Sequence, residues 1–124
     1  MTMQDSIRSA QQVGLRLNPD GSAHFEFCFP TDDQTFAGHF PHRPLLPGVF
    51  QLEIVRSAAQ SVLKQPLTVR EIVKAKFLRP IIPTEIVRVE LKLNEKPDTI
   101  TARASFSVTG QPAGEAILHL VRGS

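Results

Sequence analysis

One stretch of this chain constrains the fold more than any other, because it has the pattern of a helix that must be buried. Residues 48–64 are apolar around most of the circumference of a helix, and Pro66 follows them. The polar positions form one narrow stripe at Glu53, Ser57, Gln60 and Lys64. A helix with so little polar surface packs inside a protein rather than along its outside. We therefore expect an architecture that surrounds this helix.

Most of the remaining chain has the two-residue alternation of strands. Apolar side chains alternate over residues 13–17 and 25–29, and the turn sequence of residues 18–21, Asn-Pro-Asp-Gly, predicts a hairpin. Further strands are expected at residues 73–77, 87–93, 100–108 and 114–121. A single helix cannot cover both faces of a doubly wound sheet, so we predict an α+β fold in which an antiparallel sheet wraps around the helix.

Composition argues against several classes of function. The chain has 124 residues, 41% of them apolar, so we expect a single domain over residues 1–124. A pocket for a lipid chain would take up much of the interior of so small a domain. A site shared by two subunits is therefore plausible. The net charge is +2, and Trp and Tyr are absent, which argues against nucleic-acid binding. Cys28 is the only cysteine, which argues against an intramolecular disulfide and a thiolate metal site. Neither a membrane span nor a signal peptide is apparent, so we expect a cytoplasmic protein.

Residues 30–47 have no periodicity and contain four of the ten prolines. A segment this long without regular structure in a compact domain usually has a function. It includes Gly38-His39-Phe40-Pro41 and ends in Pro44-Leu45-Leu46-Pro47, directly before Gly48. Glu53 follows within the predicted helix, 14 positions after the histidine.

This pattern resembles the signature of the β-hydroxyacyl-acyl-carrier-protein dehydratases of fatty acid synthesis, a hotdog-fold family. Residues 76–83, Lys-Phe-Leu-Arg-Pro-Ile-Ile-Pro, are similar to a second segment of that family. The resemblance implies a hotdog fold and a dehydratase that removes water from a (3R)-3-hydroxyacyl thioester on acyl carrier protein, leaving the trans-2-enoyl thioester. It also implies a homodimer or dimer-based oligomer, with the histidine and the acid of one site in different subunits, and no cofactor. The implied site residues are catalytic His39, Glu53 and Gly48 and substrate-binding Phe40, Pro47, Val49 and Phe77.

Dehydration needs these residue types for chemical reasons. A base takes the α-proton, an acid protonates the departing hydroxyl, and a donor faces the thioester oxygen as negative charge develops. His39 suits the base because histidine titrates near neutral pH. Glu53 suits the acid if it is protonated, a form that burial beside Val49 and Phe50 would favour. Gly48 opens the helix, where backbone N–H groups and the positive end of the dipole can stabilise the oxyanion.

Simpler interpretations remain for these residues. Glu53 could merely begin the polar stripe of the helix, and His39 could be a hydrogen-bonded structural residue. His39 and His42 could start a metal site, but Pro41 breaks helical geometry between them and no third ligand has suitable spacing, so we expect no metal. A separate basic cluster is either a solvated strand face or a landing patch for an acidic carrier protein; its members are Arg70, Lys74, Lys76 and Arg79.

Two other functions also remain open. An acyl thioesterase of the same fold would activate water with a carboxylate, and a non-catalytic module would only bind acyl groups. Many members of the resembled family carry a glutamine four residues after the acid, where this chain has Ser57. That difference bears on the substrate and is compatible with a specialised acyl pathway, such as aryl polyene assembly.

Overall fold

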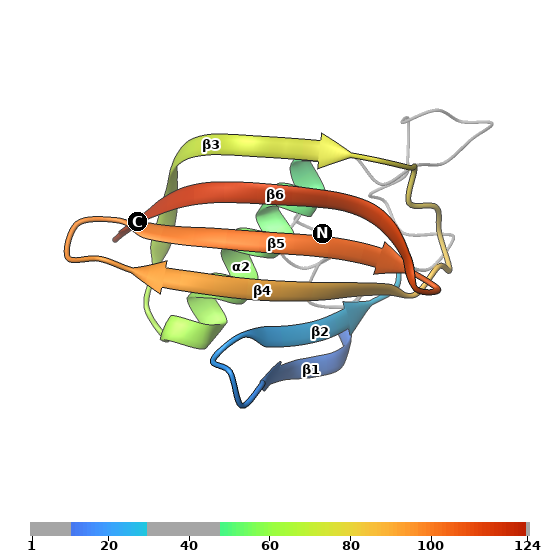
Figure 1. Ribbon diagram of the computed structural model, residues 1–124, viewed down its shortest axis with the longest axis horizontal. Helices are drawn as coiled ribbons and strands as arrows, with labels where there is room; N and C mark the ends of the chain where they lie inside the picture. Colours follow the sequence, from blue (N-terminus) through green and yellow to red (C-terminus); the bar gives the residue numbers. More distant parts are fainter. Residues whose placement is uncertain (1–10, 30–47, 124) are drawn as a thin grey trace.

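The computed structural model describes residues 11–29 and 48–123, so His39, Phe40 and Pro47 lie outside the described residues. Within these residues, six strands form one sheet in the order β1-β2-β4-β5-β6-β3, and each neighbouring pair is antiparallel. The helix α2 crosses one face of this sheet (Figure 1). The predicted architecture is therefore confirmed. The elements are β1 (Gln11–Leu17), β2 (Ala23–Phe27), α2 (Gly48–Leu63), β3 (Leu67–Phe77), β4 (Val87–Glu95), β5 (Ile100–Val108) and β6 (Gln111–Arg122).

The β1–β2 hairpin forms where the turn sequence predicts it. Gly21 has a φ of 89°, in the left-handed region that glycine adopts without steric cost. Its N–H donates to the Asn18 carbonyl at 3.0 Å, and the Asn18 N–H donates to the Ser22 carbonyl at 2.7 Å. The Asp20 carboxylate accepts hydrogen bonds from the backbone N–H and the hydroxyl of Ser22. These bonds close the turn and bring the two strands into antiparallel pairing.

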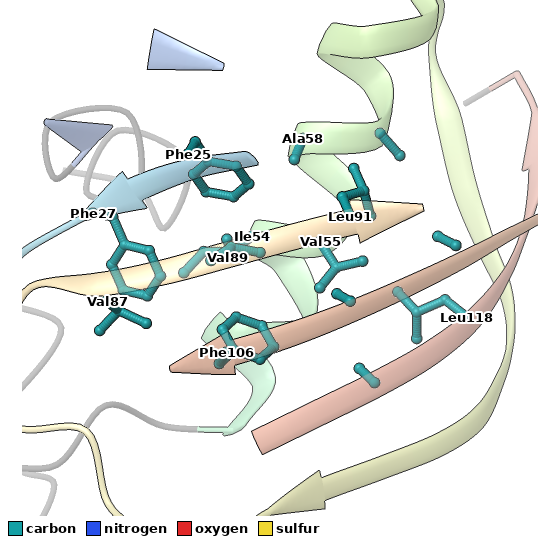
Figure 2. Close-up of a cluster of buried hydrophobic side chains, with 14 of the residues drawn as sticks. Phe25, Phe27, Ile54, Val55, Ala58, Val87, Val89, Leu91, Phe106 and Leu118 are labelled. Atoms are coloured by element: carbon teal, nitrogen blue, oxygen red, sulfur yellow. The ribbon is translucent and has the colours of Figure 1, made fainter. Parts of the chain in front are cut away.

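The hydrophobic core lies between α2 and the sheet. The helix contributes Ile54, Val55, Ala58 and Ala59, all of which are buried. Burying each large apolar side chain stabilises the fold by roughly 1.5–3 kcal/mol relative to leaving it exposed. Figure 2 shows the strand side chains of this cluster, which include Phe25, Phe27, Val87, Val89, Leu91, Phe106 and Leu118.

The helix ends one residue earlier than the sequence predicted. Lys64 adopts a φ of 56°, and its N–H donates to the Gln60 carbonyl at 2.8 Å. A residue in the left-handed region is a common way to end a helix. The chain then turns directly into β3, which begins at Leu67.

Strand β3 differs from the prediction in its length and its alternation. It starts at Leu67, six residues before the predicted strand, and its register with β6 shifts at Arg70 and again at Val73. Each shift inserts one extra residue into β3, as in a β-bulge. The two-residue alternation predicted over residues 73–77 is interrupted at its start, because Val73 is the extra residue of the second bulge and Ile72 lies opposite Leu118.

Apart from the two bulge residues, the paired side chains of β3 divide between the two faces of the sheet according to polarity. Residues opposite one another in an antiparallel pair point to the same side, and Leu118 and Leu120 of β6 are buried against the helix. On this helix side the β3 residues are Leu67, Val69, Ile72, Ala75 and Phe77. On the outer side they are Thr68, Glu71, Lys74 and Lys76. The helix-side row is apolar throughout, yet Ile72 is 52% exposed and Phe77 is 47% exposed.

Candidate active site

The first turn of α2 packs against the end of β3. A Cβ atom at Gly48 would lie only 2.7 Å from Cε2 of Phe77, so a side chain at this position would displace the ring. Backbone N–H groups in the first turn of a helix have no acceptor within that helix. The structure thus brings together two predicted site residues, and it gives a physical reason for the glycine.

Glu53 lies farther along α2, half-buried, and its carboxylate forms an ion pair with Arg56. Nε of Arg56 donates to both carboxylate oxygens at 3.0 Å, and Nη2 also donates to Oε1. The hydrogen bond to Glu53 raises the pKa of the Arg56 guanidinium above its usual value. The expectation of an apolar surrounding for this carboxyl needs correction, because a guanidinium lies against it and Val49 is 59% exposed.

Arg56 is a site residue that the sequence analysis missed. Its Nη1 donates to Oε1 of Gln60 at 2.7 Å and to the Leu67 carbonyl at 3.0 Å. Gln60 Oε1 accepts a second hydrogen bond from the Leu67 N–H at 3.0 Å. The spacing of three residues between Glu53 and Arg56 was the available signal, since side chains at i and i+3 are neighbours on a helix. The start of β3 therefore anchors the Arg56 side chain.

Gln51 is a second feature that the pattern of the helix did not reveal. Its side chain is 3% exposed, and its Oε1 has no hydrogen-bond partner among the described residues. It lies beside Gly114, where an added Cβ would be 3.7 Å from this oxygen and 2.8 Å from the Lys76 carbonyl oxygen. A buried acceptor without a partner costs about 1–3 kcal/mol of stability.

Gly48 and Glu53 point in different directions from the same helix. Five residues correspond to a rotation of about 140° and a rise of about 7.5 Å along an α-helix. The Gly48–Phe77 contact and the Glu53–Arg56 pair are thus two separate clusters of the described chain. Of the other predicted site residues, Val49 is exposed on α2, whereas the remaining three lie outside the described residues: His39, Phe40 and Pro47.

A cavity of about 30 Å³ lies between α2 and the β1–β2 hairpin. This volume suits one or two water molecules and is too small for an acyl chain. Ser57, the position where the chain departs from the resembled family, is part of its wall. The other lining residues are Leu15, Phe25, Phe27, Ile54, Ala58 and Ser61.

Within residues 11–29 and 48–123, no group of three His, Cys, Asp or Glu side chains is placed to hold a metal ion. His39 and His42 lie outside these ranges. No helix in the same ranges is long and apolar enough to cross a membrane.

Comparison with known proteins identifies the family. The ApeI-like family, described as ApeI dehydratase, matches residues 16–116. The chain belongs to the ApeI-like family. One structure of similar fold is the dehydratase heterocomplex ApeI:P from Xenorhabdus doucetiae, with a TM-score of 0.77 and 27% identity over 90% of this chain and 96% of that one.

More distant relatives extend this result. The 3-hydroxyacyl-[acyl-carrier-protein] dehydratase FabZ of Granulibacter bethesdensis is 27% identical over 90% of this chain, which spans 65% of that enzyme's length. A hypothetical thioesterase with coenzyme A from Streptococcus pneumoniae has a TM-score of 0.73 at 8% identity, over 98% of this chain and 94% of that one. At that identity the likeness concerns the fold alone. Together with the antiparallel sheet around α2, these matches confirm the hotdog fold for this ApeI-like chain.

The two glutamines of α2, buried Gln51 and half-buried Gln60, give predictions of opposite sign for the same substitution. Gln51→Leu removes an acceptor without a partner, so the free energy of unfolding in urea should rise by about 1 kcal/mol. Gln60→Leu, the matched control, leaves Arg56 Nη1 and the Leu67 N–H without their acceptor and should lower it by about 1–3 kcal/mol. A loss in Gln51→Leu as large as that in Gln60→Leu would contradict this interpretation.

Proposed function

We propose that this protein removes water from a 3-hydroxyacyl thioester carried on acyl carrier protein and forms the 2-enoyl thioester. Membership in the ApeI-like dehydratase family is the observation that carries the proposal. Two features of the described chain support it: a glycine opens α2 beneath the ring of Phe77, and a half-buried carboxylate follows on the same helix. The relatives named as dehydratases favour this chemistry over hydrolysis, because the thioesterase likeness concerns only the fold.

In the proposed reaction, the His39 imidazole takes the proton from Cα. The electron pair of that bond forms the Cα–Cβ double bond, and the Cβ–O bond breaks. The departing hydroxide takes a proton from Glu53 and leaves as water. The Gly48 N–H donates to the thioester oxygen while negative charge develops there. The acyl carrier protein presents the thioester, and the exposed basic residues Arg70 and Lys76 are candidates for contact with an acidic carrier surface.

The arrangement of α2 favours a site built from two chains. On one helix the Gly48 N–H points along the axis toward the N-terminus, whereas the Glu53 side chain lies about 7.5 Å farther along and points away from the axis. These two groups therefore do not converge on one substrate. A second copy facing the helix would supply the missing half of each site. We therefore propose a dimer in which His39 and Gly48 of one chain face Glu53 of the other.

The free edge of β3 is the surface that we propose for this dimer. Among the described strands, β3 pairs only with β6, and its other edge is unpaired. Long edge strands with apolar side chains are prone to pair with another chain. The exposed helix-side residues Ile72 and Phe77 lie along this strand and would be covered by a second copy.

Charge complementarity selects one register for that pairing. A two-fold axis through Ile72 would place Glu71 of each copy opposite Lys74 of the other. Because Val73 is a bulge residue, Glu71 and Lys74 are the paired positions directly before and after Ile72. It would also oppose apolar Val69 and Ala75 on the helix side. Moving the axis one pair either way would oppose two copies of Lys74 or of Glu71, and like charges directly opposite are destabilising.

Turnover of a crotonyl thioester tests the reaction. We expect loss of the enoyl absorbance through hydration, without release of free thiol. His39→Ala and Glu53→Gln should each lower kcat by about 10²–10⁴ while circular dichroism shows an intact fold. Release of thiol would instead identify a thioesterase, and no turnover of either kind would identify an acyl-binding module.

Charge reversal tests the dimer surface. Glu71→Lys places like charges opposite each other at the proposed axis and should shift the protein from dimer to monomer in sedimentation velocity. Adding Lys74→Glu restores opposite charges and should restore the dimer. Arg88→Glu, on the outer face of β4, is the matched control and should leave the dimer unchanged. A wild-type protein that sediments as a monomer by itself would refute pairing between copies and leave the edge to a different subunit.

Subunit mixing tests whether each site is shared. A heterodimer of His39→Ala with Glu53→Gln would contain one doubly altered site and one intact site. After complete exchange at equal concentrations, half of the dimers are mixed, so activity should recover to about a quarter of wild type. If the mixture stays inactive after verified exchange, each site is built within one chain.

A further inference from the structure

We infer that Arg56 is a positioning residue that fixes the orientation of the Glu53 carboxylate. This inference rests on the function proposed above and names a residue outside the motif that carries that function. Arg56 would act on the reaction through Glu53 and would not touch the substrate.

The geometry shows a side chain held at both ends. Toward the site, Nε lies 3.0 Å from each carboxylate oxygen of Glu53. Toward the sheet, Nη1 bonds to Gln60 Oε1 and to the Leu67 carbonyl, at the first residue of β3. The planar guanidinium can make these contacts together because its donors diverge in a fixed fork. The carboxylate is therefore tied to the start of a strand, not merely to its own helix.

The surroundings make the charge of Arg56 effective. The side chains of Arg56 and Glu53 are only 13% and 20% exposed, so water screens the pair less than it screens a surface ion pair. The strands packed against α2 turn apolar side chains toward it. These side chains are Leu67 and Val69 of β3, Val87, Val89 and Leu91 of β4, Ile100, Ala102 and Ala104 of β5, and Leu118 and Leu120 of β6. The titratable group expected from the motif, His39, lies outside the described residues.

The consequence for catalysis follows from geometry. A group that exchanges a proton with the substrate must lie within hydrogen-bond reach of it and in the right direction. The fork of Arg56 keeps the Glu53 carboxylate aimed in one direction.

The separate effects on kcat and KM in crotonyl thioester hydration test this inference. In Arg56→Gln kcat should fall by up to about 10²-fold as the carboxylate loses its fixed orientation, while KM changes little because Arg56 does not touch the substrate. In Arg56→Lys kcat should remain reduced because an ammonium cannot span both oxygens. A wild-type kcat in Arg56→Gln, or a loss carried by KM alone, overturns the inference.

Arg122→Gln is the matched control. Arg122 donates to the Glu95 carboxylate at 3.1 Å and to the backbone carbonyls of Lys96 and Pro97, an arrangement like that of Arg56 but away from α2. This variant should keep the wild-type kcat. If it reproduces the loss of kcat seen in Arg56→Gln, the effect is a general consequence of losing a cation, and the inference fails.

A double-mutant cycle separates this inference from the proposed function. If Arg56 acts through Glu53, Arg56→Gln should lower activity in the wild-type background and have little further effect in the Glu53→Gln background. An equal factor in both backgrounds, with thermal unfolding lowered alike, would show a purely structural role. If Glu53→Gln alone keeps wild-type turnover, the proposed site itself is wrong. Should Arg56→Gln not fold, the same cycle with Arg56→Lys still decides the inference, because the loss of kcat in Arg56→Lys should also vanish in the Glu53→Gln background.

Discussion

The structure depends on the burial of one apolar helix against the sheet face that surrounds it. Since α2 buries one apolar face, the strands beside it must present apolar side chains, and every described strand from β2 to β6 contributes to the buried core. Two polar residues of the helix are accommodated by specific contacts: Arg56 and Gln60 bond to each other and to the start of β3. These bonds fix the rotation of the helix as well as its position. A side chain can present a functional group in one direction only if its helix is fixed in this way.

Strand β3 links the two clusters of the site. At its beginning, the Leu67 carbonyl holds Arg56, which holds Glu53. At its end, the Phe77 ring packs on Gly48 at the other end of α2. The strand thus runs along the helix and sets the position of both catalytic candidates within the described chain. The proposed dimer also forms along the edge of this strand. A change in the pairing of β3 would therefore shift the Leu67–Arg56–Glu53 contacts and the Phe77–Gly48 contact directly.

Local sequence predicted the elements whose pattern is set locally. The Asn18–Gly21 turn needed only a glycine at a positive φ, and α2 needed only its run of apolar residues before Pro66. The failure in β3 concerns long-range contacts. The bulges of β3 arise from its pairing with β6, and the residues of the strand itself do not predict them. The surrounding of Glu53 was predicted as apolar from its helix neighbours, but the Arg56 side chain is held against it by a strand that begins 14 residues later than Glu53.

The two glutamines of α2 differ in their effect on the stability of the fold. Gln60 is fully used, since its Oε1 accepts from both Arg56 and Leu67, and its presence needs no other explanation. Gln51 is buried more deeply, yet its Oε1 lacks a partner among the described residues and lies beside Gly114. A leucine would fill the same space without the penalty of an unmade hydrogen bond. The described contacts therefore explain the glutamine at position 60 by its contribution to stability, and they do not explain the one at position 51 in that way.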